Sequence, residues 1–153
     1  MATQNTINAN SPTRNDPFNG FNFTVTWNGL TVAGFKQCSG LDSSTASIKY
    51  REGSDMDLAQ REIPGLSSFS NISLQRGITT ELDLWAWRKD VMSGVINRQN
   101  LTITLQDNNR VNQRSWTIRN CWPTKWTGPS FDATADAIAI ETLELAHEGI
   151  EVA

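Results

Sequence analysis

Short runs in which apolar and polar residues alternate constrain the fold of this chain more than any other feature. Apolar side chains recur at every second position in residues 21–27, 71–76 and 101–106. This is the period of a β-strand with one buried face. Asn28-Gly29 follows the first run and has the residues preferred in a two-residue hairpin turn. Further strands are predicted at residues 30–37 and 45–51 and around Trp116 and Ile118.

A helical period is found in residues 80–93, where two adjoining apolar stripes recur at helical spacing. One stripe contains Leu84, Trp87 and Val91, and the other contains Leu82, Trp85 and Met92. Thr79 or Thr80 is expected to cap this helix and Gly94 to end it. We interpret Trp85 and Trp87 as residues that pack onto a sheet, in preference to a ligand cage. One helix among many strands, without βαβ alternation, predicts a mainly β fold: an antiparallel β-barrel or sandwich with one flanking helix.

Three segments interrupt the alternation. Residues 52–68 contain Gly53, Pro64 and Gly65 and are predicted to form a long polar loop, which in a compact domain is usually functional or disordered. The proline-bounded segment 122–129 is expected at a sheet edge or corner. In the last strand Ile138 and Ile140 share one face, whereas Leu143 and Leu145 have the opposite parity. This slip predicts a bulge, or a strand that leaves one packed surface for another.

Size and charge bound the function. The 153 residues predict one domain over residues 17–153, preceded by a flexible polar arm over residues 1–16. A net charge of -3 without a basic face argues against specific nucleic-acid binding. No apolar run approaches the ~18 residues of a membrane span, so insertion of the monomer into a membrane is not expected. Cys38 and Cys121 are expected to be reduced thiols, with a disulfide as the alternative.

Residue patterns for catalysis or metal binding are weak. His147 is the only histidine, and we interpret it as a hydrogen-bonded structural residue, because triads and most zinc sites need histidine with positioned partners. Asp55, Asp57 and Glu62 do not have the spacing of a calcium loop. We therefore predict no catalytic residue, no metal and no cofactor, and a protein that is not an enzyme.

Several short motifs follow one another in a distinctive order. They are Phe23–Trp27, Ser39-Gly40-Leu41, Tyr50-Arg51-Glu52-Gly53, Ile63-Pro64-Gly65, Arg76-Gly77, the Trp-bearing helix, Trp122-Pro123 with Trp126, and the closing run IETLELAHEG. This set resembles the contractile phage tail-tube family, which includes the inner tubes of phage-like contractile injection systems. The closing run is the most specific part and contains Glu141, Leu143, Glu144, Leu145, His147, Glu148 and Gly149.

The resemblance implies a structural subunit of a hollow inner tube, with a tail-tube or Hcp-like fold and an extended inter-ring loop. Proteins similar to this form six-subunit rings that stack inside a contractile sheath, as a conduit for cargo. The implied partners are further copies of the chain, the sheath protein, baseplate or spike proteins, tube-terminating proteins and the cargo in the lumen. The implied place is the bacterial cytoplasm during assembly, and afterwards a phage tail-like particle.

The resemblance also implies residue roles. The ring-stacking loop would contain Arg51, Glu52, Gly53, Asp55, Asp57, Arg61, Glu62, Ile63, Pro64 and Gly65. From the strand pattern, a polar lumen face is expected to contain Lys49, Arg51, Ser73 and Gln75.

Two alternatives stay open beside the injection-system tube. One is the tail tube of an intact contractile-tailed phage or prophage, which has the same fold. The other is a small-ligand-binding β-barrel, a monomer with exposed tryptophans as its platform.

Overall fold

A computed structural model describes residues 16–27, 30–32 and 34–153. In these residues the chain forms ten strands, paired antiparallel, and one helix. The strands are β1 (Phe23–Trp27), β2 (Leu30–Val32), β3 (Phe35–Ser39), β4 (Ser43–Tyr50), β5 (Arg61–Phe69), β6 (Ile72–Gly77), β7 (Gln99–Gln106), β8 (Asn112–Thr127), β9 (Ile140–Ala146) and β10 (Gly149–Val152). The predicted arm, apart from Asp16, and the Asn28-Gly29 turn lie outside the described residues.

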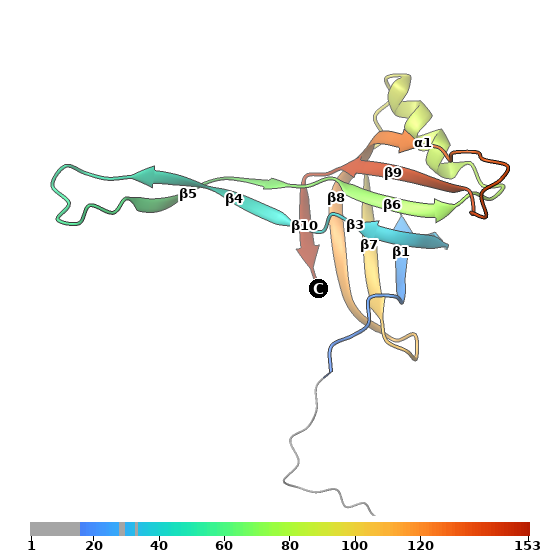
Figure 1. The fold of residues 1–153 in the computed structure, drawn as a ribbon, viewed down its shortest axis with the longest axis horizontal. Coiled ribbons are helices and arrows are strands. Elements are labelled where there is room, and N and C mark those ends of the chain that lie inside the picture. Colours follow the sequence, from blue (N-terminus) through green and yellow to red (C-terminus); the bar gives the residue numbers. More distant parts are fainter. Residues whose placement is uncertain (1–15, 28–29, 33) are drawn as a thin grey trace, which may run out of the picture.

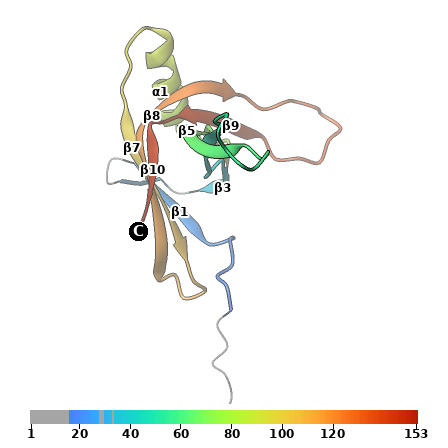
Figure 2. The same ribbon diagram turned by 90° about the vertical axis from the view of Figure 1, so that its left-hand side faces the viewer.

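Two layers of strands form the body. The β7 layer consists of β2, β1, β7, the first part of β8, and β10. The β9 layer consists of residues 122–127 of β8, then β9, β6 and β3. Strands of the two layers cross at a steep angle (Figure 1), and the β9 layer lies across one end of the β7 layer (Figure 2). β8 passes from one layer to the other near Asn120, whose φ is 53°.

The hydrophobic core lies between the layers and follows the predicted alternation. The β7 layer contributes Val25, Leu101, Ile103 and Ile118, and the β9 layer contributes Ile72, Leu74, Leu143 and Leu145. Each of these side chains is at most 4% exposed. The predicted mainly β fold, an antiparallel barrel or sandwich with one helix, is confirmed, and the single subunit has the sandwich arrangement. Both cysteines are free, as expected, with Cys121 buried in this core.

The predicted helix is α1 (Asp83–Met92), which packs against β8. Leu84 and Trp87 are buried, and Trp87 contacts Trp27 in a tilted arrangement with ring centroids 4.2 Å apart. Trp85 contacts Trp126, so the predicted packing role of both tryptophans is confirmed.

The details of the helix termini and of its second stripe differ from the prediction. The expected threonine cap is wrong, because Leu82 is the N-cap residue and makes no side-chain cap. Arg76 donates a hydrogen bond to the Glu81 carbonyl, which holds this segment outside the helix. The second apolar stripe is also wrong for Leu82 and Met92, which are exposed.

The predicted slip of phase in the last strand is wrong. β9 begins at Ile140, and Ile138 is 82% exposed in the loop before it. Glu141, Leu143 and Leu145 share one buried face without a bulge. The alternation of apolar residues placed the start of the buried face wrongly, because its first residue, Glu141, is charged and yet buried. The chain does leave one packed surface for another, but later, between β9 and β10.

Two boundaries of the early strands also change. The predicted return strand at residues 30–37 is two strands, since β2 pairs with β1 in one layer and β3 pairs with β6 in the other. Gly34, with φ of 90°, lies between them. Residues 122–127 form an outer edge of the β9 layer, which confirms the edge prediction for this proline-bounded segment.

The largest correction concerns residues 52–68. Residues 61–68 lie within β5, which pairs with β4 in a separate two-stranded sheet that projects far from the body (Figure 1). Pro64 and Gly65 predicted a loop because they are unfavourable in a central strand. In a two-stranded hairpin both strands are edges, and here the register shifts between Thr45 and Ser47, opposite these residues.

Candidate assembly surfaces

The β4–β5 hairpin has two chemically different faces in its distal half. Ile48 pairs with Ile63, and Tyr50 with Arg61, so these four residues share one face. The opposite face contains Lys49 and Glu62, whose charged groups lie 3.7 Å apart. Residues of both strands are largely exposed. An isolated two-stranded hairpin is marginally stable in water, so such an arm is suited to a partner that covers it.

The turn at the end of the hairpin, residues 51–60, is held by polar contacts of two arginines, Arg51 within it and Arg61 just after it. Arg61 Nη2 lies 2.5 Å from Asp55 Oδ1. Arg51 donates hydrogen bonds to the carbonyl oxygens of Asp55 and Asp57. Between these polar contacts, Met56 is 98% and Leu58 is 89% exposed. The tip therefore presents two apolar side chains on a turn held by its own ion pair and hydrogen bonds.

The root of the hairpin is fixed to the body. Gly40 has φ of 97°, and a Cβ there would lie 2.1 Å from the Asn71 carbonyl oxygen. Asp42 accepts a hydrogen bond from the Ser70 amide. His147 Nε2 lies 2.8 Å from the Ser70 carbonyl oxygen, and its ring contacts Phe69. These contacts set the direction in which the hairpin leaves the body.

The face of the β9 layer that points away from the core is polar. Paired residues in antiparallel strands share a face, so the register gives two rows across β3, β6, β9 and β8. The rows are Ser39, Ser73, Glu144 and Lys125, and Gln37, Gln75, Thr142 and Thr127. The four predicted lumen residues are not brought together: Ser73 and Gln75 lie on this face, Lys49 is on the hairpin, and Arg51 is in its turn.

The β9 layer has two open edges. β3 is at one end of its strand order, and residues 122–127 of β8 are at the other. In the described part of the chain neither edge has a second partner strand. Unpaired edges offer backbone donors and acceptors to another chain.

A buried ion cluster joins the β9 layer to α1. Arg76 Nε donates to Glu141 Oε1 at 2.7 Å, and Arg76 also pairs with Asp83 in the first turn of the helix. Trp126 Nε1 donates to Glu141 Oε2 at 3.2 Å. Burial by itself lowers the pKa of Arg76, but the hydrogen bonds to Asp83 and Glu141 outweigh it and raise that pKa. Sequence reasoning missed this cluster, although Arg76 continues the inward parity of Ile72 and Leu74.

Comparisons with known proteins give one consistent result. The model of the family described as T4-like virus tail tube protein gp19 matches residues 19–151. The chain belongs to this tail tube family. Comparison by sequence with curated proteins finds no match.

Solved structures of similar fold include two chains of contractile particles. One is from an extracellular contractile injection system, the PVC sheath-tube complex in the extended state, with 28% identity, 90% of this chain and 91% of that chain covered, and a TM-score of 0.81. Another is from the anti-feeding prophage cap (AFP tube terminating cap), with 27% identity, coverages of 96% and 97%, and a TM-score of 0.85. Hcp1 from Flavobacterium johnsoniae shares the fold at 14% identity, coverages of 85% and 93%, and a TM-score of 0.53.

The C-terminal motif of this tail tube protein has structural roles. Leu143 and Leu145 are core residues, and Glu141 belongs to the buried ion cluster. Glu144 lies on the polar face, and His147 holds the hairpin root. Glu148 accepts a hydrogen bond from Asn120 at the bend of β8, and Gly149 begins β10. The motif thus connects both layers and the hairpin.

The described residues contain no cluster of three side chains that could hold a metal ion. The one described helix is too short to cross a membrane. The matched family is one of tail tube proteins, and two of the similar chains come from a sheath-tube complex and a tube terminating cap.

Proposed function

We propose that this tail tube protein is the structural subunit of the hollow inner tube of a phage-like contractile injection system. Its copies form hexameric rings, and the rings stack into a tube that serves as a conduit for cargo. Support comes from the family match over residues 19–151 and from the likeness to chains of the PVC sheath-tube complex and the AFP tube terminating cap. The observation that carries the proposal is the β9 layer, with one apolar face, one polar face and two open edges.

Ring closure follows from those edges. β3 of one copy pairs with residues 122–127 of the next, so four strands from each of six copies form one closed barrel. Closure removes every unpaired edge of this layer. The apolar face is already covered by the β7 layer, so the polar face becomes the lumen wall.

The lumen wall is then built of hydroxyl and amide groups with balanced charge. Ser73 and Gln75 belong to it, together with Thr142, Glu144 and Lys125. Glu144 and Lys125 stand on paired positions of neighbouring strands, where opposite charges are favourable. Such a surface holds water and offers few strong contacts to a passing cargo.

Stacking is assigned to the hairpin. Strands of a closed barrel are tilted by roughly 35–45° from its axis, and the β4–β5 hairpin continues outward in the direction of the β9-layer strands (Figure 1), so that it extends partly along this axis. It therefore points from one ring to the next. The predicted stacking segment Arg51–Gly65 consists of the turn and the first half of β5. Lys49, near the end of β4, is assigned to the same contact between rings.

The remaining partners follow from the tube. The sheath protein surrounds it, and baseplate or spike and tube-terminating proteins close its ends. Subunits are made and assembled in the bacterial cytoplasm before becoming part of a phage tail-like particle.

The test is negative-stain electron microscopy of the purified chain at increasing concentration, beside a variant with Asp55→Lys and Glu62→Lys. The wild-type chain is expected to form rings and tubes with a central hole. The variant is expected to keep its circular dichroism spectrum and form no tubes. Wild-type-length tubes from the variant would remove the stacking role of the hairpin. A wild-type chain that stays monomeric and binds a small ligand with a change in tryptophan fluorescence would favour the ligand-binding barrel.

The family description favours one alternative, the tail tube of a contractile-tailed phage. Neighbouring genes separate the two functions. Capsid and terminase genes beside this gene indicate a phage, whereas an ATPase gene without capsid genes indicates an injection system.

A further inference from the structure

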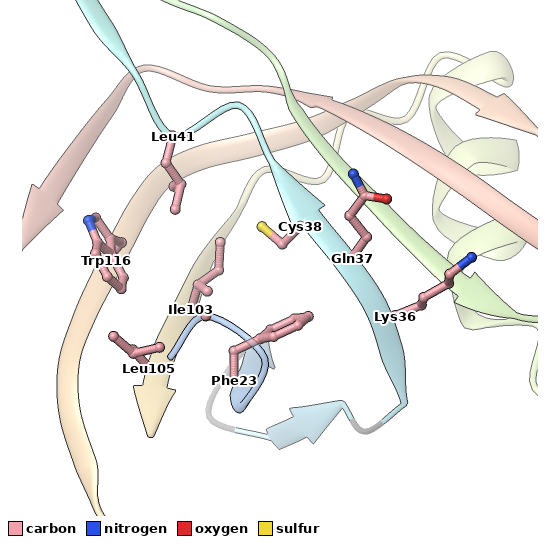
Figure 3. Close-up of a pocket in the computed structure, with 9 residues that line it drawn as sticks. Phe23, Lys36, Gln37, Cys38, Leu41, Ile103, Leu105 and Trp116 are labelled. Atoms are coloured by element: carbon pink, nitrogen blue, oxygen red, sulfur yellow. The ribbon is translucent and has the colours of Figure 1, made fainter. Parts of the chain in front are cut away.

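An apolar groove of about 230 Å³ lies where the two layers separate. Side chains from β1, β3, β7 and β8, with Leu41 after β3, gather around it (Figure 3). Its apolar lining contains Phe23, Cys38, Leu41, Ile103, Leu105 and Trp116. The groove is thus a place where the sandwich leaves apolar surface uncovered.

The hairpin of the same copy is directed away from this groove. Its root is pinned by the close approach of Gly40 to Asn71 and by the contacts of Ser70 with Asp42 and His147. From there the hairpin projects clear of the body (Figure 1). An apolar tip held at a distance from its own body can reach only another molecule.

The tip and the groove are complementary in chemistry. The tip presents Met56 and Leu58, the two most exposed large apolar side chains of the described residues. Both are unbranched at Cβ and can enter a narrow groove. Asp57 stands between them in the sequence, and the side chain of Lys36, on β3 beside the groove, points away from the apolar lining (Figure 3). The match is therefore one of apolar surfaces, and burying both removes apolar area from water.

We infer that the groove receives Met56 and Leu58 from the hairpin of a second copy of this chain, in the adjacent ring. This inference rests on the proposed tube function and names the receiving surface of the stacking contact. Each copy contributes one tip and one groove, so the contact is head-to-tail and continues from ring to ring. A second hollow next to the groove shares Leu41 and Trp116 with it and extends the apolar surface toward Ile150 and Val152.

Cys38 in the groove allows a direct test by disulfide cross-linking. Leu58→Cys and Met56→Cys are made separately, and each full-length variant is concentrated, treated with a mild oxidant and run on a non-reducing gel. Because burial raises the pKa of Cys38 to about 11, oxidation is carried out at mildly alkaline pH. A disulfide forms only when the two Cβ atoms come within about 4.5 Å. Ser54→Cys, also exposed in the turn, is the matched control.

The expected result is a ladder of dimers, trimers and longer chains from the Leu58 or Met56 variant. The ladder is lost after reduction, in the control, and when Cys38→Ala is added. Dimers without a ladder would mean a symmetric contact and would overturn the inference. Cross-linking of an Ile7→Cys variant to Cys38, with none from the tip variants, would assign the groove to the N-terminal segment and also overturn it.

Electron microscopy of the same samples separates this inference from the proposed function. Tubes without cross-links from either tip variant retain the tube function and reject the groove as the receiving site. A ladder without tubes retains the contact and rejects the tube. Absence of both rejects both.

Discussion

The strands of the sandwich body and those of the β4–β5 hairpin differ in how far their side chains are buried. In the body, β6 and β9 alternate strictly between buried and half-buried residues. In the hairpin, both strands are exposed along nearly their whole length, and Leu66 is 87% exposed. Both regions are paired antiparallel strands of similar length. The difference is where their apolar side chains find a partner: within the chain for the body, outside it for the hairpin.

This contrast separates stability from assembly. Substitutions in the body should lower the free energy of unfolding, and those in the hairpin should leave it nearly unchanged while affecting tubes. Each prediction below compares one residue of the body or root with a matched residue of the hairpin.

The largest effect is expected for Arg76→Ala. It leaves Glu141 and Asp83 without their cation, and breaking a buried ion pair in this way costs about 3–5 kcal/mol. Arg61→Ala breaks the ion pair with Asp55 in the exposed turn and should cost less than about 1 kcal/mol. Urea unfolding followed by tryptophan fluorescence measures both. Equal losses would contradict the distinction between the buried cluster and the turn.

A second pair compares two leucines. Leu74→Ala removes a fully buried side chain and should cost about 2–5 kcal/mol. Leu66→Ala should change the free energy of unfolding by no more than about 0.5 kcal/mol, because its side chain is already in water. The same urea titration applies. A loss above 2 kcal/mol for Leu66 would show that the hairpin packs on its own body.

Two glycines test whether the hairpin root is more constrained than the hairpin turn. Gly40→Ala places a Cβ against the Asn71 carbonyl oxygen at a positive φ, and a strained residue of this kind costs about 1–3 kcal/mol. Gly53→Ala, in the turn, meets no atom within 4 Å and should be nearly neutral in stability. Thermal unfolding by circular dichroism ranks the two. An unaffected midpoint for Gly40→Ala would mean that the root is not rigid.

The smallest effect is a difference in reactivity without a change in stability. Burial raises the pKa of Cys38 to about 11, so its thiolate is scarce at neutral pH and increases about tenfold per pH unit until pH approaches 11. Alkylation by iodoacetamide should be slow and rise with pH over this range. Cysteine introduced by Ser67→Cys on the exposed hairpin should react faster at pH 8. Equal rates would place Cys38 in open solvent.

Local patterns predicted the elements whose surroundings are simple. β1, β6 and β7 each bury one face, so period-two alternation identified them, and Leu84 and Trp87 identified the helix. The prediction failed where a residue's partner is distant in sequence. The charge of Glu141 predicted an exposed side chain, but the side chain is buried because Arg76, 65 positions away, compensates that charge.

Distant partners also explain why the sequence predicted the candidate surfaces only in part. Pro64 and Gly65 predicted a loop where the chain forms β5, because a sequence does not show that both strands of the hairpin are edges. Ser73 and Gln75 were placed on a polar face, but Lys49 has the same alternation and lies in another sheet. Alternation indicates which side of a strand is polar, not which sheet contains the strand.

The continuous strand β8 has a mechanical consequence. Its first part pairs with β7 and β10, and its last six residues pair with β9. A force along the β9 layer, which forms the lumen wall in the proposed tube, is therefore carried into the other layer by the covalent backbone of β8. Hydrogen bonds at the bend, from Asn120 to Asn100 and Glu148, brace the point where this load changes direction. We therefore expect the two layers of the proposed tube subunit to move together under an axial load.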